Sequence, residues 1–192
     1  MIATLPYDRA RAIEYARRWA LDRNPLFVNF SGIGGDCTNF VSQCLLAGGG
    51  VMNYTPTYGW YYISEDSRSP SWTGVDELYD FLTGKPEFAR ENGGTGPFAS
   101  EVRSNRMVEV GDVIQLSNAE GIFYHSLIIS EILPNEVLVC AHSIDSLDRP
   151  LSTYEYTGLR VLHVEGVRLS YTGGAGFYDL LEGVALPQTL DI

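Results

Sequence analysis

The sequence predicts an α+β domain in which N-terminal helices pack against a C-terminal antiparallel sheet. Two observations lead to this prediction. Apolar residues recur at helical spacing in three segments before residue 85, and from residue 108 onward they form short strand-like runs separated by turn residues. Helices followed by strands, rather than alternating with them, are typical of this class.

The length and composition fit one globular domain. The chain has 192 residues, of which 45% are hydrophobic and 19% charged, so it is long enough to bury a sizeable core. We expect the folded domain at residues 1–170. Residues 171–192 are Gly-rich and then apolar, and they are predicted to form a loosely docked tail.

Three helices are predicted in the N-terminal half. Each combines an apolar stripe with a stop signal, which is Asn24-Pro25 for the first helix and glycine for the other two. We expect them at residues 7–21, from an Asp36 cap to residues 48–50, and from a Thr73 cap to Gly84. Residues 51–72 and 85–106 are expected to be irregular.

Four strands are predicted in the C-terminal half. Their apolar runs lie between clusters of turn residues, and Pro134-Asn135 predicts a hairpin turn between the second and third strands. The expected strands are residues 112–116, 124–132, 136–142 and 159–164, with 166–169 as a continuation of the last.

Cys37 is the candidate nucleophile. It follows Gly35 and Asp36 at the expected start of the second helix, where the positive end of the helix dipole favours a thiolate. Asp36 is predicted to cap this helix through its carboxylate. Cys44 and Cys140 lie in apolar surroundings instead, so we expect them to be structural.

Two downstream histidines are candidates for the other catalytic roles. A thiolate that attacks an amide needs a base with a pKa near neutrality, and His125 lies at the start of a predicted strand. A regular hairpin around Pro134-Asn135 would set His142 opposite His125, so His142 is the predicted orienter. Asp145 is the competing orienter.

Other polar and aromatic side chains have weaker assignments. The backbone N–H of Cys37 is a natural oxyanion donor, and the candidates for the second donor are Asn39 and an upstream backbone amide, whereas Gln43 lies too far along the helix. His163 alternates with apolar residues on the last strand and is expected to face solvent. The aromatic residues near the cysteine helix are expected either to line a substrate cleft or to pack as core; they are Trp60, Tyr61 and Trp72.

Charge and composition exclude several partners. The net charge of −11 argues against nucleic acids and anionic membranes, and no segment has the length and apolarity of a membrane span. Three cysteines without short paired spacing indicate reduced thiols rather than disulfides or a zinc cluster. The N-terminus carries no signal peptide, so the chain as it stands is expected to be cytoplasmic, and extracytoplasmic if it is a trimmed piece.

The motifs resemble the bacterial putative amidase domain, a family related to the papain-like CHAP and NlpC-type cell-wall peptidases. The similarity covers roughly residues 7–151, and its most specific part is Asp-Cys-Thr-Asn-Phe-Val-Ser-Gln at residues 36–43. Val110-Gly111-Asp112, His125-Ser126 and His142-Ser143 also match. The resemblance implies a papain-like fold, Cys37 as nucleophile, His125 as base and a polar orienter on the following strand.

The leading functional hypothesis is therefore a cysteine amidohydrolase or peptidase that acts through a thioester on small peptides, including peptidoglycan-derived ones. The alternatives are an acyl or amide transferase that uses the same thioester, and a catalytically silent binding module. A zinc site formed by Cys37, His125 and His142 is conceivable, but a cysteine at a helix start fits a nucleophile better. No cofactor is expected, and the oligomeric state stays open.

Overall fold

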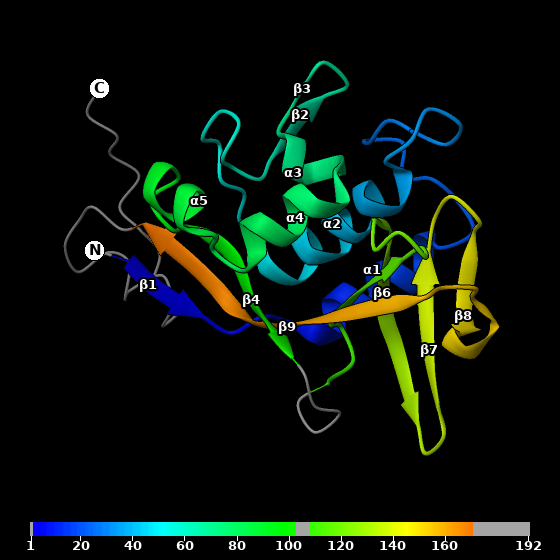
Figure 1. Ribbon diagram of the computed structural model, residues 1–192. Helices are drawn as coiled ribbons and strands as arrows, with labels where there is room; N and C mark the ends of the chain where they lie inside the picture. Colours follow the sequence, from blue (N-terminus) through cyan, green and yellow to red (C-terminus); the bar gives the residue numbers. More distant parts are fainter. Residues whose placement is uncertain (1, 103–107, 171–192) are drawn as a thin grey trace, which may run out of the picture.

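A computed structural model of the chain describes residues 2–102 and 108–170, and it shows a mixed α+β architecture built on one large antiparallel sheet (Figure 1). The predicted tail from residue 171 lies outside the described residues. The fold class predicted from the order of helical and strand patterns is confirmed at this level.

The helical part contains two longer helices and three short ones. Helix α1 spans Arg9–Trp19 and α2 spans Asp36–Gly49, as expected from their apolar stripes. The expected third helix is α4, Val75–Leu82. Its predicted Thr73 cap was wrong, because Thr73 ends the short helix α3 (Pro70–Thr73) and Gly74 is the residue that precedes α4. Helix α5 spans Pro86–Glu91.

Within residues 2–102 and 108–170 the large sheet has seven strands. Its described order is β1-β9-β5-β6-β7-β8, and β4 pairs with β9 outside this path. The strands are β1 Ile2–Leu5, β4 Gly96–Val102, β5 Val113–Ser117, β6 Phe123–Leu133, β7 Glu136–Ala141, β8 Ser146–Pro150 and β9 Gly158–Ser170. A separate two-stranded sheet pairs β2 (Tyr62–Ser64) with β3 (Ser67–Arg68), and a 3-10 turn, η2, follows β8 at Leu151–Thr153.

The expected loop at residues 85–106 was wrong. It contains α5 and the strand β4, which begins Gly96-Pro97. Proline cannot donate to a ladder and is typical of edge strands, and β4 is such a strand because, among the described residues, it pairs with β9 alone. The sequence pattern of a loop therefore coincides here with that of an edge strand.

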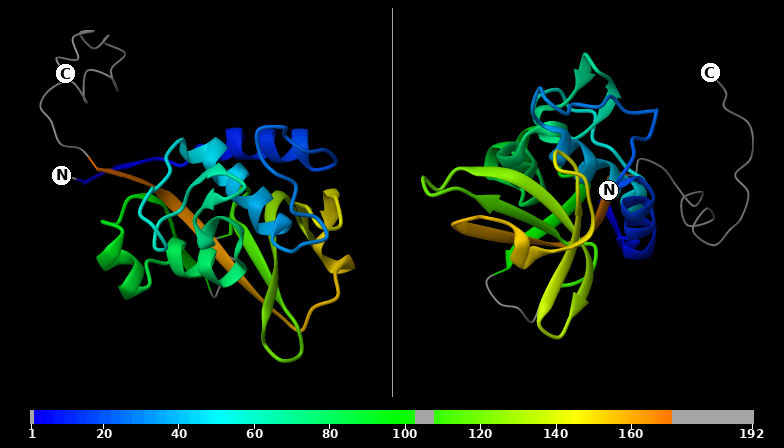
Figure 2. Two further views of the ribbon diagram at one scale, coloured as in Figure 1. Left: turned by 90° about the horizontal axis from the view of Figure 1, so that it is seen from above. Right: turned by 90° about the vertical axis from the view of Figure 1, so that its right-hand side faces the viewer.

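The helices lie on one face of the sheet (Figures 1 and 2). One apolar cluster packs between the helices and the sheet, and a second cluster covers the other face of the sheet. On the helix side, Phe40 and Cys44 of α2 belong to the main core together with Ile128 of β6. On the other side, Leu127 and Ile129 of the same strand belong to a second cluster. Alternate residues of β6 thus face opposite sides, and this alternation decides where the candidate histidines point.

Candidate functional site

Cys37 is the second residue of α2. Gly35 precedes the helix with φ = 94°, a left-handed conformation that favours glycine, and a Cβ there would lie 3.1 Å from the Thr73 carbonyl oxygen. The Cys37 side chain is 5% exposed, and its sulfur lies 3.8 Å from the hydroxyl oxygen of Thr38. The thiol is therefore nearly buried at the positive end of the helix dipole.

The start of α2 is joined to β6 by a buried hydrogen bond. The hydroxyls of Thr38 and Ser126 are 3.0 Å apart, and the Ser126 hydroxyl also accepts from the Gln115 side-chain amide at 3.2 Å. Thr38 directly follows Cys37, and Ser126 directly follows His125. The fold thus brings the chain segments of the predicted nucleophile and the predicted base together.

The His125 ring itself lies on the opposite face of β6 from Ser126. His125 pairs across the ladder with Leu116 of the second cluster, and its ring centroid is 5.9 Å from that of Tyr154. Within the described residues no hydrogen bond joins the ring to the Cys37 thiol or to any other group. Burial, together with the Arg149 charge, lowers the pKa of His125 to about 4, so the ring is neutral at pH 7.

The predicted pairing of His142 with His125 was wrong. The β6–β7 ladder pairs Ile129 with Val139 and Ile128 with Cys140, after a bulge at Ser130 that shifts the register. Continued by two residues, this register sets His142 opposite Ser126. Because a shift of one residue exchanges the faces of a strand, His142 points toward the helices and His125 points away from them.

His142 is instead held by Asp36 and α1. Its ring stacks on Phe40 with centroids 4.0 Å apart, its Nε2 lies 2.9 Å from the Trp19 carbonyl oxygen, and its Nδ1 lies 3.2 Å from Asp36 Oδ2. The Nδ1 contact is at ion-pair distance but lacks the alignment of a hydrogen bond. Both ring nitrogens therefore face oxygen atoms of the protein.

Asp36 does not cap the helix through its side chain, which corrects the prediction. Gly35 is the N-cap, and Asp36 is the first helical residue, with its carboxylate turned back to the preceding loop. Burial would raise the pKa of this carboxyl. The contact with His142, the Phe30 N–H and the Asn39 amide outweigh burial and hold the pKa well below its ordinary value. Asp36 is thus a fully buried carboxylate ion.

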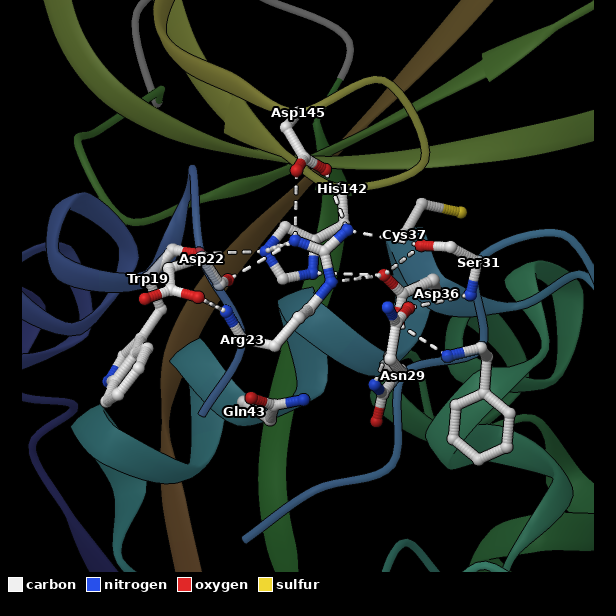
Figure 3. A network of polar contacts seen from close by, with 12 residues as sticks. Trp19, Asp22, Arg23, Asn29, Ser31, Asp36, Cys37, Gln43, His142 and Asp145 are labelled. Carbon is white, nitrogen blue, oxygen red and sulfur yellow. Dashed lines mark hydrogen bonds and ion pairs between the residues drawn. The ribbon is translucent and has the colours of Figure 1, made fainter. Parts of the chain in front are cut away.

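Arg23 completes this site, and sequence reasoning missed it. Its Nε lies 3.1 Å from Asp36 Oδ2, and its two terminal nitrogens donate to the two carboxylate oxygens of Asp145 at 3.1 and 2.7 Å. Figure 3 shows Arg23 and His142 turned toward the Asp36 carboxylate, whereas the Cys37 sulfur points away from them. We call Asp36, Arg23, His142 and Asp145 the Asp36 cluster.

The remaining candidates occupy structural positions. Both donor hydrogens of the Asn39 amide have acceptors, the Val28 carbonyl and Asp36, so the amide is turned away from an oxyanion position. Trp60 and Trp72 are fully buried in the main core and donate to Ser42 and Asn39, so of the two expected roles they take that of core residues. Tyr61 is half-buried and lies against Tyr54.

His163 does not face solvent as expected. Its Nδ1 lies 2.9 Å from the buried carboxylate of Asp112, and Arg9 also binds that carboxylate at 2.7 Å. This group fastens α1 to β5 and β9, because Arg9 also donates to the Val164 carbonyl at 2.7 Å. The period-2 pattern could not reveal this contact, since it depends on a charge on a neighbouring strand.

The part of the chain that the structure describes holds no group of three or more His, Cys, Asp or Glu side chains arranged for a metal ion. That the protein acts without a cofactor stays a prediction. None of the helices within residues 2–102 and 108–170 is long and apolar enough to cross a membrane.

Comparison with known proteins matches residues 6–164 to a family described as the putative amidase domain. An uncharacterized protein of Bacillus subtilis (strain 168), YhbB, is 35% identical over 143 residues, which make up 73% of this chain and 42% of YhbB. The chain spans less than half the length of that relative. No solved structure matches it.

Proposed function

Because the chain belongs to the putative amidase domain family, we propose that it is a cysteine-dependent amidase with a papain-like arrangement of its site. The family description indicates an enzyme that hydrolyses amides. The cysteine mechanism is our own step, and it rests on the position of Cys37 at the start of α2. The proposed substrates are small peptides, including peptidoglycan-derived ones.

In the proposed reaction, the Cys37 sulfur attacks the amide carbonyl carbon while His125 takes the thiol proton. The backbone N–H of Cys37 stabilises the oxyanion of the tetrahedral intermediate. When the C–N bond breaks, His125 gives the proton to the leaving amine, and the acyl group remains on sulfur as a thioester. Water then attacks the thioester with His125 as base, which releases the acid and restores the thiol.

The observation that carries the proposal is the hydrogen bond between Thr38 and Ser126. It fixes the start of α2 against β6 at 3.0 Å, next to both Cys37 and His125. This role requires the backbone around His125 to rearrange when substrate binds, because in the structure the ring lies on the face of β6 opposite Ser126 and Thr38.

His125 is a better candidate for the base than His142. Among the described residues its ring nitrogens have no hydrogen-bond partner, and its lowered pKa keeps the ring unprotonated at pH 7, although it also makes the ring a weaker base than an ordinary histidine. His142 has both nitrogens directed at the Trp19 carbonyl and Asp36. We therefore assign His142 to holding Asp36 rather than to orienting His125.

The test is a search for the acyl-enzyme. The protein is incubated with a library of peptides and peptidoglycan fragments, quenched in acid and analysed by mass spectrometry. An acyl adduct on Cys37 supports the proposal and identifies the substrate, and the Cys37→Ala variant, treated in the same way, must lack the adduct. Hydrolysis that persists in Cys37→Ala would overturn the cysteine mechanism.

A further inference from the structure

A buried negative charge lies directly beside the proposed nucleophile. Asp36 precedes Cys37 in the chain, its side chain is fully buried, and its contacts hold its pKa well below the ordinary value. A carboxylate near a thiol disfavours the thiolate and raises the thiol pKa. The reactivity of Cys37 therefore depends on what balances the Asp36 charge.

Two groups in the described part of the chain provide positive charge to Asp36. His142 lies 3.2 Å from Oδ2, but it carries a charge only when it is protonated. Arg23 lies 3.1 Å from the same oxygen and is charged at every pH at which a thiol titrates. Arg23 is therefore the permanent counter-charge.

The same guanidinium joins three parts of the chain. Besides Asp36 at the start of α2, it binds the Ser31 hydroxyl at 3.2 Å in the loop before α2, and Asp145 in the loop after β7. Its side chain is 23% exposed, so most of its charge is directed inward (Figure 3). A planar, multidentate group suits this position, because it must form an ion pair with Asp36 and donate hydrogen bonds to Ser31 and Asp145 at once.

We propose that Arg23 is a positioning residue for Cys37: it balances the Asp36 carboxylate and fixes the start of α2, and its removal makes the thiol less reactive at neutral pH. This inference deepens the proposed function, because it explains how the nucleophile of that site is activated. Arg23 acts through Asp36, since the Cys37 sulfur points away from the cluster.

The charged and titratable groups around Cys37 come from four segments. Asp36 lies on α2, Arg23 after α1, and His142 and Asp145 after β7, while His125 on β6 is the proposed base. Of these, Arg23 alone keeps a positive charge through the titration range of a thiol. Its removal must therefore shift the pH dependence of the Cys37 reaction in one direction, toward higher pH.

The experiment measures the alkylation of Cys37 by iodoacetamide as a function of pH, with the modified peptide quantified by mass spectrometry. In Arg23→Gln we expect the midpoint to rise, so that the rate at pH 7 falls roughly three- to tenfold, while rates at pH 10 converge with wild type. Arg23→Lys keeps the charge and should recover most of the rate at pH 7. A purely structural role would lower the melting temperature without moving the midpoint.

Arg17→Gln is the matched control. Arg17 is an arginine in the last turn of α1, and it pairs with Asp148 and Glu131 rather than with Asp36. It loses the same unit of charge and should keep the wild-type midpoint. Equal shifts of the midpoint in Arg17→Gln and Arg23→Gln would mean that only the net charge matters, and they would overturn the proposal. A folded Arg23→Gln protein with the wild-type midpoint would overturn it as well.

A second variant covers the case in which Arg23→Gln fails to fold. Adding Asp36→Asn removes the charge that Arg23 balances, so the double variant should fold and should alkylate at pH 7 faster than Arg23→Gln. A double variant that stays unfolded contradicts the assigned role. If Cys37→Ala keeps full hydrolysis, the proposed function fails, but the midpoint shift still decides the role of Arg23.

Discussion

The hydroxyls of Thr38 and Ser126 lie 3.0 Å apart in the buried contact between α2 and β6, although 88 residues separate them in the chain. Neither residue carries a predicted catalytic role. Each is the immediate neighbour of a residue that does, so the proposed site depends on this contact for its alignment.

The first prediction concerns this pair. Thr38→Val and Ser126→Ala should each lower the free energy of unfolding by roughly 1–2 kcal/mol, because each leaves a buried hydroxyl without its partner. The double variant should cost clearly less than the sum of the two, since both remove one interaction. Urea unfolding measures all three, and strict additivity would mean that the hydrogen bond contributes nothing.

The three cysteines should respond differently to replacement by alanine. Cys37→Ala is expected to abolish turnover of the substrate found by the acyl-adduct search. Cys44→Ala and Cys140→Ala remove fully buried thiols, so they should lower stability by roughly 1 kcal/mol and leave the chemistry intact. A folded Cys140→Ala protein without activity would contradict the assignment.

His125 should affect both rate and acid stability. As general base, its replacement by Gln or Ala should reduce turnover roughly 10²- to 10⁴-fold at pH 7. Because its folded pKa of about 4 lies below the ordinary value of 6.5, the unfolded chain binds the proton first, and stability falls as the pH falls from 6.5 toward 4. At pH 5 this amounts to about 2 kcal/mol.

Urea melts at pH 7.5 and pH 5 test the second part of that prediction. The difference in unfolding free energy between the two pH values should be smaller in His125→Gln than in wild type. An equal pH dependence in the two proteins would show that the ring is not buried in its neutral form.

His142 should couple energetically to Asp36 and not to His125. Replacing His142 by Ala breaks a buried contact with a carboxylate ion and removes the stacking on Phe40, at a cost of about 3 kcal/mol. In double-mutant cycles of stability, His142→Ala and Asp36→Asn should be strongly non-additive. A coupling energy between His142→Ala and His125→Ala that is larger than the one with Asp36→Asn would contradict this prediction. It would favour a direct contact between His142 and His125, which the register of β6 and β7 argues against.

The sequence predicted those elements whose patterns are local. The apolar stripes of α1 and α2, the strands β6 and β7, and the Pro134-Asn135 turn all follow from spacing and turn chemistry. Strand β4 escaped prediction because Gly96 and Pro97 are as typical of loops as of edges.

The site was harder to predict because it depends on register and on distant charges. Nothing in the residue Ser130 marks it as a bulge, yet this one residue decides which histidine faces α2. Arg23 and Asp145 are 122 residues apart, and each looks like an ordinary charged loop residue until the fold brings them together. The local sequence was enough to identify Cys37 as the candidate nucleophile. Only the tertiary structure could identify Arg23 as the counter-charge of the neighbouring Asp36.

The position of β9 in the sheet has a consequence for how the protein is made. This strand pairs with β5 through residues 158–162, with β4 through residues 161–168 and with β1 through residues 167–170. When translation has reached only Thr157, the strands β1, β4 and β5 have been made, but β9, with which all three pair, has not. Such pairings between distant segments form slowly and leave strand edges exposed in the meantime. The sheet can therefore close only after synthesis has passed Ser170, and until then the nascent chain exposes the edges of these strands.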